Sequence, residues 1–113
     1  MAEAINYQHK SLAAGRWQKM TFFEQMSNVG SEVERTISWR GKKAEYSQAA
    51  FDRALELLDL TLSDARNRSR LKELCRVREA LVDYFQFDNT YCSTDKTWQN
   101  YFYGFSYAAR LSA

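Results

Sequence analysis

Residues 66–87 read RNRSRLKELCRVREALVDYFQF and combine two patterns. Apolar residues recur at spacings of three and four, which is typical of a helix with one buried face. The same segment carries the densest positive charge in the chain. We therefore predict a helix over residues 68–87 that forms one wall of the core. Its apolar stripe is Leu71, Leu74, Val77, Leu81 and Tyr84/Phe85, and its basic residues are Arg66, Arg68, Arg70, Lys72, Arg76 and Arg78.

Two details of this helix follow from residue type. Asparagine commonly caps helix N-termini, so we expect Asn67 to begin the helix. Cys75 falls beside the apolar stripe, where a free thiol behaves as a small hydrophobe. Because Cys75 and Cys92 have neither CxxC spacing nor neighbouring histidines, we expect two reduced thiols.

An earlier helix is predicted from Trp17 or Thr21 to Arg40. Thr21 followed by Glu24 matches a capping box, which makes the start ambiguous. Gly30 lies in the middle of this predicted helix, where glycine costs about 1 kcal/mol relative to alanine. We therefore expect that a neighbouring helix or a partner chain approaches closely at Gly30. Gly41 is expected to end the helix. The stripe reads Met20, Phe23, Met26, Gly30, Val33 and Ile37.

Two more amphipathic segments complete the chain, at about residues 43–63 and 95–111, the latter capped by Thr94. The chain contains no proline, and no segment alternates as a strand does. Short connections make successive helices antiparallel. We therefore predict an all-α, antiparallel up-down-up-down four-helix bundle. Residues 1–15 are expected to form a flexible N-terminal arm and residues 16–113 a single bundle domain.

Composition limits the classes of function. The net charge of +2 is well below the excess typical of a dedicated nucleic-acid binder. The N-terminus lacks a leader pattern, and no apolar run approaches the ~18 residues of a membrane span, so we expect a cytoplasmic protein without membrane contact. The only histidine, His9, lies in the expected arm, and neither a Glu-x-x-His pair nor a glycine-rich phosphate loop is present. We therefore expect a protein that uses no metal and no cofactor and has no enzymatic activity. A hydrolase or nuclease built on carboxylates alone is the enzyme alternative left open.

Charged residues suggest two kinds of contact. Opposite charges at helical spacing predict solvated salt bridges, or a polar network between helices; the residues concerned are Glu32, Arg35, Arg53, Glu56, Glu73 and Arg76. The basic segment could bind nucleic acid, although Glu73 and Glu79 interrupt it and Lys42 and Lys43 are expected at the opposite end of the bundle. The residues of that interface would be Arg66, Arg68, Arg70, Lys72 and Arg76.

Aromatic residues make up 15% of the chain and crowd into its last third. A four-helix bundle cannot bury every ring, and exposed Tyr and Trp are enriched at protein interfaces. We therefore expect Trp39, Tyr103 and Tyr107 to take part in self-association or in binding a fixed partner.

Three stretches together resemble a small family of uncharacterised prokaryotic all-helical proteins: EQMSNVGSEVERTISWR (24–40), AFDRALELLDLTLSD (50–64) with RLKELCRVREALVDYF (70–85), and STDKTWQNYFYGFSYAAR (93–110). In general shape this family is similar to HEPN-like four-helix bundles, which often dimerise and pair with minimal nucleotidyltransferases. The catalytic HEPN motif, an arginine followed four to six residues later by a histidine, is absent here. The resemblance thus implies a non-catalytic, homodimeric interaction module, with a nucleotidyltransferase as its partner.

Overall fold

The structure, a computed structural model, describes residues 15–111. The predicted N-terminal arm, apart from its last residue, and His9 therefore lie outside the described residues. The described chain forms four α-helices and two short 3-10 helices. Their bounds are η3 (Trp17–Lys19), α1 (Phe22–Trp39), α2 (Ala44–Ser63), η4 (Ala65–Arg70), α3 (Leu71–Gln86) and α4 (Asp95–Leu111).

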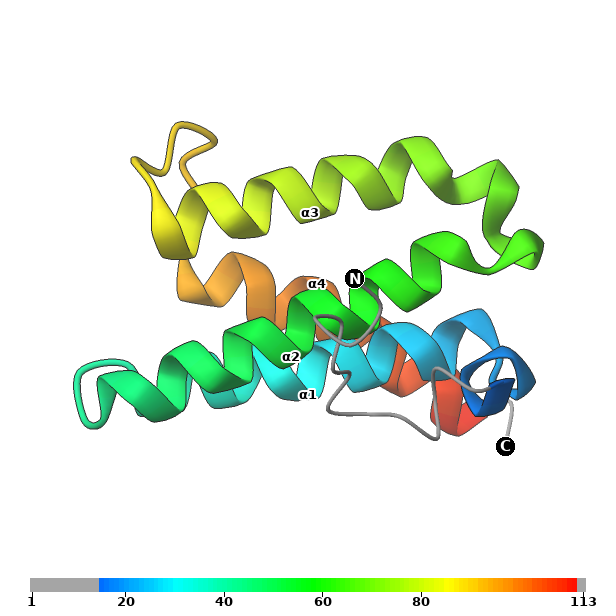
Figure 1. Cartoon of the computed structure of the whole chain (residues 1–113), viewed down its shortest axis with the longest axis horizontal. Coiled ribbons are helices and arrows are strands. Elements are labelled where there is room, and N and C mark those ends of the chain that lie inside the picture. The colour runs from blue at the N-terminus through cyan, green and yellow to red at the C-terminus, as the bar shows by residue number, and fades with distance from the viewer. Residues whose placement is uncertain (1–14, 112–113) are drawn as a thin grey trace, which may run out of the picture.

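Successive helices run in opposite directions, which confirms the predicted antiparallel four-helix fold (Figure 1). Helix α1 packs closely against both α2 and α4, whereas α3 keeps a larger backbone separation from its neighbours. The α1–α2 connection and η4 lie at opposite ends of the molecule (Figure 1). Lys42 and Lys43 are therefore far from the basic segment, as expected. No helix within residues 15–111 has the length and apolar character needed to cross a membrane.

The core follows the predicted stripes in part. On α1, Met26 and Val33 are buried as predicted, but Phe23 is 37% exposed because its side chain lies at the edge of the helix face, and Val29, which was not in the predicted stripe, is fully buried. Helix α2 contributes the most apolar residues, because α1 and α3 both pack on it. The buried apolar side chains are Met26, Val29 and Val33 of α1, Ala50, Phe51, Ala54, Leu57, Leu58 and Leu60 of α2, Leu74, Val77 and Leu81 of α3, Trp98 and Phe102 of α4, and Trp17 of η3.

The start and end of α1 are fixed by local chemistry. The Glu24 amide donates to Thr21 Oγ1 at 3.1 Å, and the Thr21 amide donates to Glu24 Oε1 at 2.8 Å. This complete capping box satisfies two amides at the helix start, so the helix begins after Thr21. Trp17 belongs to a separate 3-10 turn. Gly41 follows the helix with φ of +87°, a conformation that glycine adopts at little cost.

The third helix begins differently from the prediction. Asn67 does not cap it; this expectation was wrong, because Asn67 lies buried within η4 and its side chain bonds to other elements. The side-chain nitrogen Nδ2 of Asn67 donates to Gln25 Oε1 and to the Thr61 carbonyl, both at 2.9 Å. Asp64 provides the cap of η4 instead, accepting from the Arg66 amide at 3.0 Å.

Asn67 is part of a buried polar cluster that ties the N-terminal turn to the end of α2. Gln25 Nε2 donates to Asp64 Oδ2 at 2.9 Å and to the Trp17 carbonyl at 3.0 Å. Trp17 Nε1 donates to Thr61 Oγ1 at 3.1 Å. Since buried polar groups stabilise a fold only when they are paired, this cluster fixes how η3, α1, α2 and η4 meet.

Helix α3 buries a narrower stripe than predicted. Leu71 is 38% exposed, and Cys75 is also exposed, so Cys75 does not act as a small core hydrophobe. Helix α3 stands farther from its neighbours, so Leu74, Val77 and Leu81 are its fully buried apolar residues, while Tyr84 and Phe85 pack against the core partly buried.

Candidate interaction surface on helix α4

Helix α4 has a second face, opposite its buried one. Trp98 and Phe102 point into the core, whereas residues at spacings of three and four along the other side are exposed. This exposed row, called the α4 stripe below, consists of Asn100, Tyr103, Gly104, Tyr107 and Leu111.

Large apolar and aromatic side chains dominate the α4 stripe. Tyr103 is 61% exposed, Tyr107 50% and Leu111 69%. The two tyrosine rings stack with centroids 6.3 Å apart and planes 23° from parallel. The Arg110 guanidinium lies 6.0 Å from the Tyr107 ring centroid, which adds a cation–π contact. The rings therefore hold each other in a defined orientation at the surface.

Gly104 is the position without a side chain in this exposed row. A Cβ built at position 104 would meet nothing within 4 Å, so packing within the described chain does not require glycine there. Gly30 behaves in the opposite way, because a Cβ at position 30 would lie 2.6 Å from Phe102 Cβ. The predicted close approach at Gly30 is thus confirmed, and the neighbour is α4. The glycine at position 104 has no such reason inside the fold.

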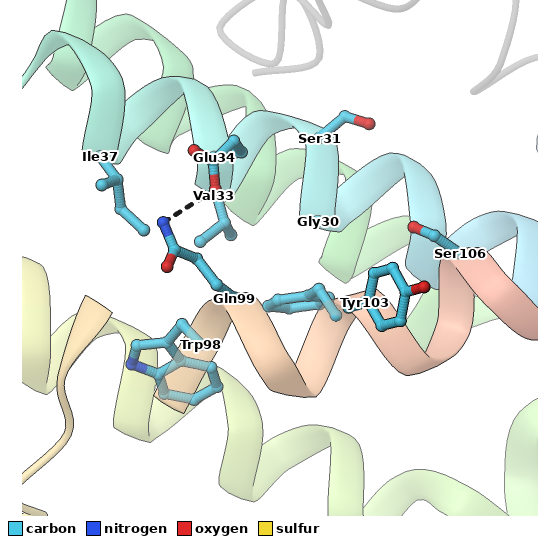
Figure 2. Close-up of a pocket in the computed structure, with 10 residues that line it drawn as sticks. Gly30, Ser31, Val33, Glu34, Ile37, Trp98, Gln99, Tyr103 and Ser106 are labelled. Carbon is cyan, nitrogen blue, oxygen red and sulfur yellow. Dashed lines mark hydrogen bonds between the residues drawn. The ribbon is translucent and has the colours of Figure 1, made fainter. Parts of the chain in front are cut away.

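A groove of about 320 Å³ runs beside the stripe, between α1 and α4 (Figure 2). Tyr103 borders both the groove and the stripe. Two polar contacts cross from α4 to α1 near the groove: Gln99 Nε2 donates to Glu34 Oε1 at 3.3 Å, and the Ser27 and Ser106 hydroxyls lie 3.1 Å apart. The groove is lined by Gly30, Ser31, Val33, Glu34, Ile37, Trp98, Gln99, Phe102, Tyr103 and Ser106.

The third aromatic predicted at an interface lies elsewhere. Trp39 sits at the α1–α2 connection, where its ring meets Tyr46 edge-on with centroids 5.0 Å apart. Tyr103 and Tyr107 are thus brought together, and Trp39 is separate from them. Gly104 and Leu111 were not among the predicted interface residues; the helical spacing of residues 100, 103, 104, 107 and 111 was the available signal.

The predicted nucleic-acid residues divide into two groups. Arg66 donates to both Asp64 oxygens and, at 2.7 Å, to the Met20 carbonyl. The Arg70 guanidinium lies 4.1 Å from the centroid of the Phe22 ring. Within residues 15–111 the other three, Arg68, Lys72 and Arg76, are exposed and form no ion pair.

The predicted polar network is present in part. Glu32, buried between α1 and α2, pairs with Arg35 at 2.8 Å and with Arg53 at 3.3 Å. Glu56 is half-buried on α2. Glu73 accepts from the Tyr101 hydroxyl at 3.1 Å, so it contacts α4 and forms no ion pair with Arg76 in the described chain.

In the part of the chain from 15 to 111, no group of His, Cys, Asp and Glu side chains has the arrangement needed to hold a metal ion. Comparison of the chain with known protein families, with curated proteins and with solved structures finds no match. By its fold and surface, the described chain is a small all-helical protein with four α-helices and an exposed aromatic face on α4.

Proposed function

We propose that this protein is a non-catalytic interaction module that forms a homodimer, with the α4 stripe of one copy packed against the same stripe of a second copy. The observation that carries the proposal is the α4 stripe itself: Tyr103, Gly104 and Tyr107 lie side by side, exposed, on one helix. Tyrosine supplies large contact area at low conformational cost, and it is enriched at protein interfaces.

The stripe favours a second copy because it is self-complementary. It presents two large rings and, at Gly104, a position without a side chain where an added Cβ would meet open space. In a two-fold interface the same patch faces itself, so each copy must supply both shapes. None of its five residues carries a charge, so the stripe itself adds no like charges to a two-fold contact; the Arg110 guanidinium borders it beside the Tyr107 ring.

Light scattering and sedimentation of the full chain over a range of concentrations test the proposal. We expect a concentration-dependent dimer that is lost when Tyr103→Glu and Tyr107→Glu are combined, because four carboxylates would then be buried at the two-fold interface. Phe87→Glu is the matched control: this ring is 73% exposed and lies outside the stripe, so the dimer should persist. A wild-type monomer at high concentration, or a dimer unaffected by the double change, contradicts the proposal.

Nucleic-acid binding by the basic segment is the alternative that the same preparation can test. Arg66 and Arg70 already have intramolecular partners, so only part of the predicted set is available. An affinity for RNA or DNA that falls steeply with salt, and that weakens when Arg68 and Lys72 become alanine, would favour this alternative.

A minimal nucleotidyltransferase, the partner that the resemblance implies, stays a prediction. A nucleotidyltransferase encoded beside this protein, and binding to it after both are purified, would support that partnership. The double tyrosine variant shows whether such a partner uses the α4 stripe or another surface.

A further inference from the structure

Two opposite charges lie at the two ends of one side of α4. Gln99, Ser106 and Arg110 fall at spacings of seven and four, so they share one side of the helix. That side faces α1, because the Gln99 and Ser106 side chains bond to side chains of α1. The row begins beside Glu34 of α1, which accepts from Gln99 Nε2 at 3.3 Å, and it ends at Arg110 in the last turn of α4. This side is called the α1 flank of the stripe below.

Both charges are available to a second chain. Glu34 and Arg110 are exposed, and neither forms an ion pair within residues 15–111. The Arg110 guanidinium lies 6.0 Å from the centroid of the Tyr107 ring, which keeps it beside the stripe. Glu34 lines the groove between α1 and α4 together with Tyr103 (Figure 2). A chain packed on the stripe therefore meets a carboxylate at one end of the α1 flank and a guanidinium at the other.

A two-fold axis allows two ways of packing the stripe on itself. If the two α4 helices run parallel, both Arg110 side chains lie at the same level, and the α1 flank of one copy faces the opposite side of the other copy's stripe. If the helices run antiparallel, the α1 flanks of both copies come together with their ends exchanged. Only the antiparallel arrangement brings Arg110 of one copy to Glu34 of the other, and symmetry makes this contact twice.

Gly104 indicates the level at which the helices cross. Packing within the described chain does not require glycine there, although glycine costs a helix about 1 kcal/mol relative to alanine. Two helix backbones approach most closely where neither has a side chain. With the crossing at Gly104, Arg110 lies six residues beyond it and therefore opposite position 98 of the other copy, one residue from Gln99 and beside Glu34. The exposed Lys96 lies eight residues before the crossing, farther out than this pair.

We propose that in the homodimer the two α4 helices pack antiparallel about Gly104, and that Arg110 of each copy forms an ion pair with Glu34 of the other. This inference rests on the proposed homodimer, and it adds the orientation of the two copies and a residue of α1 to the interface. Charge complementarity of this kind selects the partner and its orientation more than it raises affinity. The antiparallel arrangement pairs all four charges, whereas the parallel arrangement places the two Arg110 charges at one level.

Reversal of each charge in the full chain, followed by sedimentation over a range of concentrations, tests the pairing. Arg110→Glu alone and Glu34→Arg alone each replace both attractions by repulsion between like charges. We expect each change to raise the dissociation constant of the dimer about tenfold. An equimolar mixture of the two variants recreates both pairs in the heterodimer, and a chain carrying both changes recreates them in its homodimer. Both should therefore associate about as tightly as the wild type.

Lys42→Glu is the matched control, because it changes the net charge equally at an exposed position in the α1–α2 connection. It should leave the dimer unchanged. The mixture is the decisive sample: a defect confined to one chain, such as the lost bond to Gln99 or a negative charge at the end of α4, would persist in it.

The outcomes separate this pairing from the homodimer itself. A dimer that requires Tyr103 and Tyr107 but ignores the single reversals, or that is not restored in the mixture and the doubly changed chain, overturns the antiparallel pairing alone. Tighter association of wild type with Arg110→Glu than of wild type with itself would indicate parallel helices and would also overturn it. A wild-type monomer, or a dimer indifferent to the two tyrosines, contradicts the homodimer through the α4 stripe and the pairing with it.

Discussion

Phe102 on α4 lies against the backbone of α1 at Gly30. A Cβ at position 30 would be 2.6 Å from Phe102 Cβ and 2.9 Å from Cγ, which is closer than non-bonded carbon atoms can approach. The glycine therefore sets the distance between the two helices. It also places α4 so that its other face, the α4 stripe, points to solvent.

Gly30→Ala should destabilise the fold. Alanine favours a helix by about 1 kcal/mol relative to glycine, but the added methyl group forces α4 away from α1, and overpacking of this kind costs about 1–3 kcal/mol. We expect a net loss of about 1 kcal/mol in the free energy of unfolding, measured by urea denaturation. A gain in stability would show that α4 can move without cost.

Gly104→Ala should have the opposite effect on the isolated chain. The new methyl group meets nothing within 4 Å, so only the helix preference changes, and the free energy of unfolding should rise by about 0.5–1 kcal/mol at concentrations where the protein is monomeric. If the α4 stripe is the dimer interface, the same change adds a methyl group to the contact surface and weakens the dimer measured by sedimentation. A more stable chain with unchanged association would place the interface away from Gly104.

Asp64→Asn should destabilise the end of α2 and flatten the dependence of stability on pH. Hydrogen bonds from Arg66 and Gln25 hold the pKa of the buried Asp64 carboxyl well below its usual range. Losing this charge-assisted bonding should cost about 2 kcal/mol near neutral pH.

The sign of the pH effect follows from that lowered pKa. The Asp64 contribution is complete above the unfolded pKa of about 4 and is lost as the pH falls towards the folded pKa, because only the unfolded chain then takes up the proton readily. Wild-type protein should therefore lose stability below about pH 4 more steeply than Asp64→Asn, in thermal unfolding at several pH values. Asp88→Asn, which removes an exposed carboxylate, controls for net charge; equal slopes for all three proteins would contradict the prediction.

Tyr84→Phe should weaken the junction between the ends of α1 and α3 and the start of α4. The Tyr84 hydroxyl donates to Asp95 Oδ1 at 2.5 Å, and Arg40 donates to the same carboxylate at 2.6 Å. Burial opposes ionisation of Asp95, but these two donors outweigh it and lower its pKa. Because Arg40 and Asp95 are both partly exposed, we expect a loss of only about 1 kcal/mol in the free energy of unfolding. Tyr46→Phe, at an exposed ring, should change it little.

The candidate surface was only partly predictable. Tyr103 and Tyr107 could be identified in the sequence as rings in excess of the core. Gly104 and Leu111 share a helical spacing with them, but only the packing of α4 shows that this row is left exposed. Trp39 is likewise an aromatic residue in excess of the core, yet it lies at the α1–α2 connection, away from Tyr103. Residue type predicts that a ring is available, and three-dimensional placement decides which rings share a surface.

The sequence by itself determined the helices and their order. Periodic apolar residues, the Thr21–Glu24 capping box and Gly41 act within a few residues of the chain, so they can be read without knowing the fold. Only the tertiary structure decided the role of Asn67, the exposure of Cys75, the neighbour of Gly30 and the unpaired nitrogen of Trp98. The physical reason is that burial and hydrogen-bond partners come from residues far apart in the chain, and their distances are set by how the helices pack.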